Sequence, residues 1–78
     1  MNKARHTAIR KLLGELENIK SQLETIRDEE QEYFDGLSEN AQEGEKGEVS
    51  TAAIDGLEEA LGTIETAIDS LGDAAPAE

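Results

Sequence analysis

Hydrophobic residues recur every three or four positions through the first half of the chain. From Ile9 to Ile26 the steps alternate between three and four residues, and Glu30 then stands where the next apolar residue would fall. This heptad pattern predicts an α-helix with a narrow apolar stripe, whose positions a and d face another helix. Position a holds Ile9, Leu16, Leu23, Glu30 and Leu37, and position d holds Leu12, Ile19, Ile26 and Tyr33.

The residues flanking this stripe predict where the first helix begins and ends. Asn2 is suited to cap its amino end, because an asparagine side chain can accept a free backbone N–H, and we predict the helix over about 3–34. Glycines and short polar residues then predict a loop over about 35–47. Within that loop, Ser38 is suited to cap a short turn over 38–42.

A second heptad pattern follows the predicted loop and predicts a second helix over about 48–71. Its apolar residues are Ile54, Leu57, Leu61, Ile64, Ile68 and Leu71. Ser50 is the best late N-cap for this helix, whereas Glu45 and Glu48 would suit an earlier start. We expect Gly72 to end the helix in a left-handed conformation and a frayed tail over 72–78.

Small residues widen the apolar face of the second helix. Ala53, Ala60 and Ala67 repeat every seven residues at position g, beside the apolar stripe. Leu13, at position e, widens the face of the first helix in the same way. We therefore predict an all-α fold, an antiparallel helical hairpin that pairs with a second copy into a dimeric four-helix bundle. The alternative is a lone hairpin in which the alanines are simply good helix formers.

Charge is distributed unevenly along the 78 residues, and the distribution favours an antiparallel hairpin. Residues 1–27 hold six basic and three acidic side chains, whereas residues 28–78 hold one basic and sixteen acidic ones. In an antiparallel pair, Arg5 or Arg10 would lie near Glu65, Asp69 or Asp73. The net charge of −12 argues against direct binding of nucleic acid. No apolar run is long enough to cross a membrane.

Residues suited to catalysis or metal binding are sparse. His6 is the only histidine, cysteine is absent, and no glutamate is followed three residues later by the histidine of a helical di-metal site. We therefore expect no enzyme activity, no cofactor and no metal ion. Glu30 is unusual because it interrupts an apolar stripe, so it must be hydrated, paired or bound to a ligand. We favour helices that splay near the loop and leave its carboxylate in water.

Two groups of residues are suited to recognition of a ligand or a partner. Aromatic and amide side chains near the loop form the first group, which consists of Tyr33, Phe34, Asn40 and Gln42. Basic side chains near the start of the first helix form the second, which consists of Arg5, Arg10 and Lys11. In an oligomer, the basic end of one copy could meet the loop of another and form a composite pocket for an anionic ligand such as a nucleotide.

The segments around the loop resemble a family of small acidic helical proteins from bacteriophage and prophage genomes. The resemblance rests on the run from Asp28 to Asp35, on Glu39, Asn40 and Gln42, and on Glu45, Gly47 and Glu48. The chain departs from the family pattern at Gly36, Ser38 and Ala41, where the family has Asn, Pro and Leu or Met. The resemblance implies a cytoplasmic location in a bacterial host and a role in counteracting host defence.

Three functions are compatible with these observations. The first is a non-enzymatic binding protein that acts by occupancy, either by sequestering a nucleotide signal or by covering a host protein. The second is an acidic mimic of nucleic acid that blocks a DNA- or RNA-binding enzyme. The third is a scaffolding module that docks another helix on the ridge formed by Ala53, Ala60 and Ala67.

Overall fold

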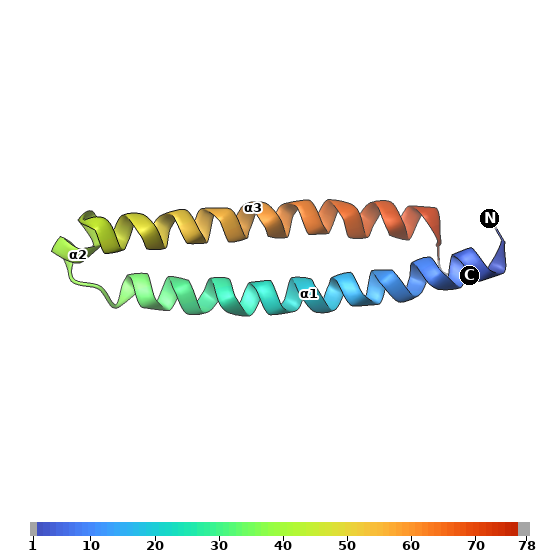
Figure 1. The fold of residues 1–78 in the computed structure, drawn as a ribbon, viewed down its shortest axis with the longest axis horizontal. Helices are drawn as coiled ribbons and strands as arrows, with labels where there is room; N and C mark the ends of the chain where they lie inside the picture. The colour runs from blue at the N-terminus through green and yellow to red at the C-terminus, as the bar shows by residue number, and fades with distance from the viewer. Residues whose placement is uncertain (1, 77–78) are drawn as a thin grey trace.

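The computed structural model describes residues 2–76 as a long helical hairpin. Helix α1 spans Lys3–Asp35, the short helix α2 spans Glu39–Glu43, and helix α3 spans Glu45–Ala74. Figure 1 shows α1 and α3 side by side and antiparallel, with α2 at one end of the rod and both termini toward the other. The Cα atoms extend over 58 × 14 × 14 Å. The predicted all-α fold and antiparallel hairpin are confirmed.

Local capping explains where α1 and α2 begin. The side chain of Asn2 accepts a hydrogen bond of 2.8 Å from the backbone N–H of Arg5, as predicted for the N-cap of α1. The Ser38 hydroxyl accepts the N–H of Ala41 at 3.2 Å and caps α2, which confirms the predicted turn. The amino ends of both helices therefore follow directly from single polar residues.

The segment predicted as a loop over 35–47 is largely helical. It contains α2 and the first turn of α3, and α3 begins at Glu45 rather than near 48. Ser50 is not the N-cap, because it lies inside α3; Gly44 occupies the cap position without a side-chain hydrogen bond. Gly47 permits the sharp corner between α2 and α3, since a Cβ atom at this residue would lie 1.7 Å from the backbone oxygen of Gln42.

The carboxyl end of α3 also differs from the prediction over 72–78. The helix continues through Gly72 to Ala74, and no residue of the described chain has a positive φ angle. Ala75 is fully buried, and its carbonyl oxygen accepts a hydrogen bond of 3.2 Å from the guanidinium of Arg10. This contact holds the end of α3 against α1, which explains why the helix does not stop at Leu71. Residues 77–78 lie outside the described residues.

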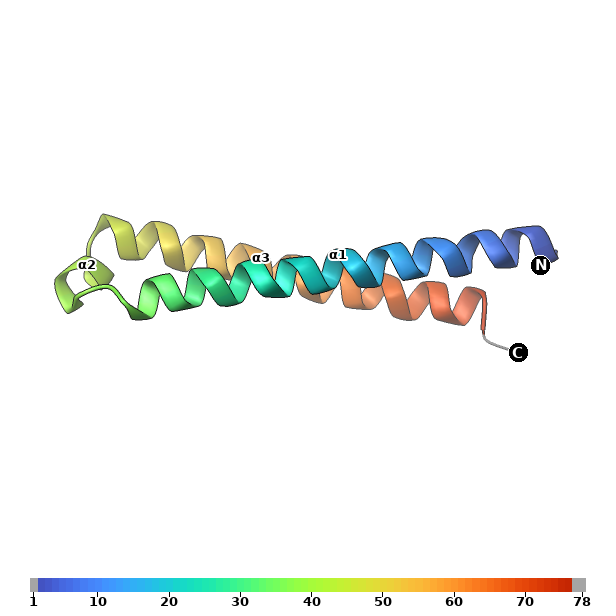
Figure 2. The same ribbon diagram turned by 90° about the horizontal axis from the view of Figure 1, so that it is seen from below.

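Helix α3 presents its predicted stripe to α1. Ile54 and Leu61 are buried, and Leu57, Ile64, Ile68 and Leu71 are half-buried. These residues occupy positions a and d, as the heptad pattern predicted. The two ribbons stay close along their whole length and cross at a small angle when the molecule is turned (Figure 2).

Helix α1 is rotated about its axis relative to the prediction. Apart from Glu24, its buried and half-buried residues occupy positions a and e, whereas the position d residues are exposed. Leu13, predicted to lie on the oligomer face, is instead 8% exposed and packs within the hairpin, near Gly72. At 100° per residue, exchanging d for e corresponds to a rotation of about 50°. The rotation also places Lys20 within reach of Glu65 on α3, at 3.2 Å.

Candidate functional site

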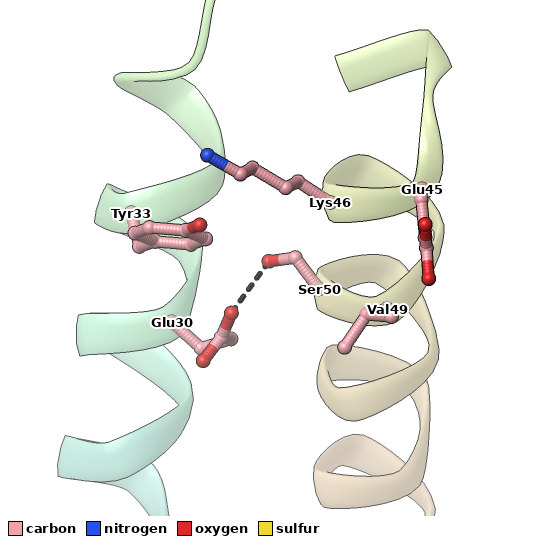
Figure 3. A pocket seen from close by; sticks show the side chains of 6 residues that line it. All are labelled: Glu30, Tyr33, Glu45, Lys46, Val49 and Ser50. Carbon is pink, nitrogen blue, oxygen red and sulfur yellow. Dashed lines mark hydrogen bonds between the residues drawn. The ribbon is translucent and has the colours of Figure 1, made fainter. Parts of the chain in front are cut away.

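A cavity of about 360 Å³ lies at the loop end of the hairpin, between α1 and the first turns of α3. Figure 3 shows the side chains that line it. Glu30 and Tyr33 come from α1, one turn apart, and the α3 residues that complete the lining are Glu45, Lys46, Val49 and Ser50. The cavity opens outward beside Tyr33, so it is a surface site rather than a packing defect in the core.

The floor of this cavity contains the carboxylate that interrupts the first apolar stripe. Ser50 is 1% exposed and donates a hydrogen bond of 2.6 Å to Oε2 of Glu30 (Figure 3). The expectation that splayed helices leave Glu30 in water is therefore wrong: the side chain is half-buried and paired. A serine inside α3 supplies the partner that a carboxylate needs at a seam position. The late N-cap prediction for Ser50 missed this role.

The rim of the cavity carries an exposed apolar side chain on each helix, together with one cation and the carboxylate of Glu45. Tyr33 is 50% exposed on α1, and Val49 is 65% exposed on α3. Lys46 reaches across from α3 toward α1, on the loop side of Tyr33 (Figure 3). The rim thus combines an aromatic ring, a branched aliphatic side chain and an amino group, a combination suited to contact with another protein surface.

The other predicted loop residues serve the connection in different ways. Phe34 is half-buried, and its carbonyl oxygen accepts a hydrogen bond of 3.0 Å from Nε2 of Gln42. Gln42 is therefore tied to the end of α1, while Asn40 is exposed on α2. Of the four predicted residues, Tyr33 alone lines the cavity.

The basic residues lie at the opposite end of the rod. Arg5 and Lys11 are exposed on α1, and Arg10 is engaged with the Ala75 carbonyl instead of with Glu65, Asp69 or Asp73. Because the hairpin is 58 Å long, a single chain does not bring Arg5, Arg10 and Lys11 to the aromatic rim. The two predicted recognition groups are thus separate sites within one chain.

The ion pair between the two helices is made by Lys20, a cation for which the sequence predicted no partner on the second helix. Lys20 of α1 lies 3.2 Å from Glu65, and its side chain is 30% exposed. The hydrogen bond and the charge of Glu65 raise the pKa of Lys20 above its usual 10.5. The pair favours the charged lysine and marks the side of the hairpin opposite the Tyr33 rim.

The most extensive feature that the sequence pattern did not assign correctly is an exposed apolar row along α1. Four residues at position d lie outside the hairpin core, and we call them the apolar row. They are Leu12, which is 52% exposed, Ile19 at 46%, Ile26 at 50% and Tyr33 at 50%. Their constant spacing of seven places them on one side of α1. The row was predicted to face α3, and it instead extends from the cavity rim toward the termini.

The alanines of α3, which we call the alanine row, lie on the same side of the hairpin. Tyr33 and Lys46 line one cavity, and a step of seven residues along each helix leads from them to Ile26 and Ala53. Further steps reach the two remaining members of each row, giving the pairs Ile19 with Ala60 and Leu12 with Ala67. Both rows therefore border one long, shallow strip, in which Ala53 is exposed and the other two alanines are half-buried.

Carboxylates are absent from the α3 half of this strip. Eight acidic residues lie on α3, and all of them occupy positions b, e or f, away from the alanine row. The residues on the outer side of the alanine row are Val49, Gly56, Thr63 and Ser70. Positions c and g of α3 thus carry no carboxylate although the net charge of the chain is −12, and Glu45, at position f, lines the cavity at the end of the strip.

Two searches for other kinds of site gave no candidate in the described part of the chain. Residues 2–76 contain no group of three or more histidine, cysteine and carboxylate side chains placed to hold a metal ion. Among the same residues, no helix combines the length and the hydropathy needed to cross a membrane.

Comparison of the chain with known protein families, with curated proteins and with solved structures finds no match. The resemblance to small phage proteins thus rests on the sequence motifs alone, of which the loop motif is the most specific.

Proposed function

We propose that the protein is a non-enzymatic binding protein that works as a dimeric four-helix bundle. The observation that carries the proposal is the exposed apolar row beside the alanine row. A single hairpin leaves four large apolar side chains about half exposed along one face. Burying them against a second copy removes this apolar surface from water, which is the main driving force for association of helical hairpins.

The size of the strip fits a stable dimer. Helix α3 has 30 residues and is about 45 Å long at 1.5 Å per residue. With a width of 14 Å, the face covers roughly 600 Å² in projection, or about 1,300 Å² for two copies, which lies within the 1,200–2,000 Å² range of specific interfaces. The accessible surface of 5653 Å² also exceeds by about 1,000 Å² the value typical of a compact monomer of 8.4 kDa.

The outside of such a bundle would carry the function. With the strip buried, the surface offered to partners consists mainly of carboxylates from positions b, e and f of α3 and of the α2 region. A rigid acidic rod of this kind acts by covering a basic or polar surface on another protein. From the resemblance to small phage proteins we propose a partner in the defence machinery of a bacterial host. Sequestration of a nucleotide signal is the other form of the same occupancy mechanism.

Mimicry of nucleic acid is a second candidate, supported by the concentration of acids away from the strip. Sixteen carboxylates follow residue 27, against one lysine. Capture of a DNA- or RNA-binding enzyme should then weaken steeply with rising salt, because charges that are exposed on both partners are screened. Capture that resists salt favours occlusion through side-chain packing instead.

The mass in solution tests the dimer directly. We expect sedimentation equilibrium to give twice the 8.4 kDa of one chain. Ala53→Glu places a charge on the strip at an exposed residue, whereas Ala52→Glu places the same charge on the neighbouring residue, at position f. We expect Ala53→Glu to give the monomer mass and Ala52→Glu to retain the dimer. A monomer mass for the unsubstituted chain at high concentration contradicts the proposal.

A further inference from the structure

The two rows that border the strip are centred at the same level of the rod. The apolar row runs from Leu12 to Tyr33, so its midpoint falls between residues 22 and 23. The alanine row is centred on Ala60. In an antiparallel pair of helices, two residues at the same level have residue numbers with a nearly constant sum. The contacts between α1 and α3 give this sum as 80 for Glu30 with Ser50 and as 85 for Lys20 with Glu65. The two midpoints add up to 82.5 and therefore lie at one level.

This coincidence matters for the symmetry of a dimer. A two-fold axis that crosses the rod at right angles maps each helix onto its own copy, running in the opposite direction. Such an axis covers both rows completely only if their midpoints lie at the same level. Both rows run along most of the two paired helices, so their midpoints meet this condition, and a dimer whose hairpins run head to tail can cover both rows.

The distribution of charge along the rod favours the same arrangement. Residues 20–60, at the loop end, hold thirteen acidic and three basic side chains, whereas the described residues at the terminal end hold five acidic and four basic ones. Two hairpins that point the same way would place two strongly acidic ends together. Hairpins that point in opposite directions place each acidic end against a nearly neutral one that carries Arg5 and Lys11.

We propose that two copies of this chain pair head to tail across the strip, so that each copy closes the cavity of the other. The inference rests on the proposed dimer and adds its orientation. Around the axis, Ile19 packs on the partner's Ile26, and Leu12 packs on Tyr33 of the partner subunit. The Tyr33 rim, 50% exposed in one chain, is then covered by the partner's Leu12. The dimer contains two such closed cavities, one near each end.

The remaining candidate recognition residues lie beyond the two ends of the apolar row. One heptad before Leu12 on α1 lies Arg5, which is exposed, and α2 with Asn40 lies at the loop end of the rod, beyond Tyr33. In the head-to-tail dimer Arg5 therefore reaches the partner's α2, which carries Glu39 and Glu43. The basic and aromatic groups, which are far apart in one chain, are brought together only by the second copy.

Cross-linking distinguishes the two orientations, and the absence of cysteine allows single thiols to be introduced. Gln22, Glu15 and Glu29 are exposed at position g of α1, at the edge of the strip, and Ser70 is exposed at the corresponding edge of α3. We expect Gln22→Cys to cross-link with itself through a short bis-maleimide. We also expect a mixture of Glu15→Cys and Glu29→Cys to give a mixed cross-linked dimer, because their numbers add up to nearly the same value as Leu12 and Tyr33.

The opposite orientation predicts a different pattern. Hairpins pointing the same way place α1 against α3 of the partner, so a mixture of Glu15→Cys and Ser70→Cys would be linked and Gln22→Cys would not. That pattern, obtained with a dimer mass, overturns the head-to-tail arrangement and leaves the proposed dimer intact. A monomer mass without any cross-link overturns both.

A charge reversal gives an independent readout. In the head-to-tail dimer Glu15 lies near Glu29 of the partner subunit, so two like-charged pairs border the strip. We expect Glu15→Lys to lower the dissociation constant about two- to fivefold, because it turns repulsion into attraction at an exposed site. The double variant Glu15→Lys/Glu29→Lys restores like charges and should return the constant to near its original value. An unchanged constant in the single variant contradicts the orientation.

Discussion

The two sides of α1 differ in how well a single hairpin buries their apolar residues. On the side that faces α3, Leu13 is 8% exposed and packs beside leucines and long amphipathic side chains. On the adjacent side, Leu12 is 52% exposed although it is the same residue type, one position away. The packed side uses position e, which also holds Lys20 and Arg27; from Leu12 to Tyr33 position d holds no charged residue. The more apolar column is the one that the single chain leaves uncovered.

This difference supports the proposal that a second surface covers the apolar row. Lys20 and Arg27 lie half-buried because their aliphatic stems can cover a seam while their charged ends reach solvent or Glu65. Leu12, Ile19 and Ile26 have no charged end to keep in water, so their exposure is a net cost unless another surface covers them.

Replacing one apolar residue buried between the helices and one in the exposed apolar row gives the largest expected effect. Leu61→Ala removes a side chain that is 5% exposed and should cost about 2–5 kcal/mol of unfolding free energy at any protein concentration. Ile19→Ala should cost little in dilute solution and increasingly more as concentration rises, because its proposed contact is with a second copy. Denaturant titrations at several protein concentrations measure both. Equal, concentration-independent costs would remove the distinction between the two sides.

Adding a side chain at Gly47, in the corner between α2 and α3, gives the second-largest expected effect. Gly47→Ala introduces a Cβ atom at 1.7 Å from the backbone oxygen of Gln42, so the backbone must shift, and we expect a loss of about 1–3 kcal/mol. Gly62→Ala is the matched control, because no atom lies within 4 Å of the added Cβ, and the change should stabilise α3 by about 0.5–1 kcal/mol. Thermal unfolding followed by circular dichroism should show opposite shifts; shifts of the same sign would contradict the tight corner.

Removing the hydroxyl of Ser50 gives the smallest effect. Ser50→Ala leaves the Glu30 carboxylate without its partner on the packed side of α1, and we expect a loss of about 1 kcal/mol, at the low end for an unpaired group because Glu30 is half-buried. Ser21→Ala, at an exposed position on the outer side of α1, should change the unfolding free energy by less than about 0.5 kcal/mol. Denaturation of both variants side by side measures the difference, and indistinguishable midpoints would show that the bond contributes nothing.

The sequence predicted single residues of the candidate site but not how they are arranged. The sequence identified Glu30 as a seam residue in need of a partner because it interrupts the apolar stripe, and Tyr33 as a candidate recognition residue because it is aromatic and lies near the loop. It did not identify Ser50 as the partner, since a serine near a helix start fits an N-cap equally well. It also did not reveal the exposed apolar row, because apolar residues at position d are expected to be buried by the facing helix.

The sequence alone determined that there are two long helices, where α1 begins, that the chain returns on itself and which side of α3 is buried. These features depend on local signals, namely heptad spacing, capping side chains and glycines in the connection, and they act within a few residues. The rotation of α1, the early start of α3 at Glu45 and the pairing of Glu30 with Ser50 were decided by the tertiary structure. Two neighbouring columns of α1 can each complete a seam with position a, and only the contacts that α3 offers, from Gly72, Glu65 and Ser50, select between them.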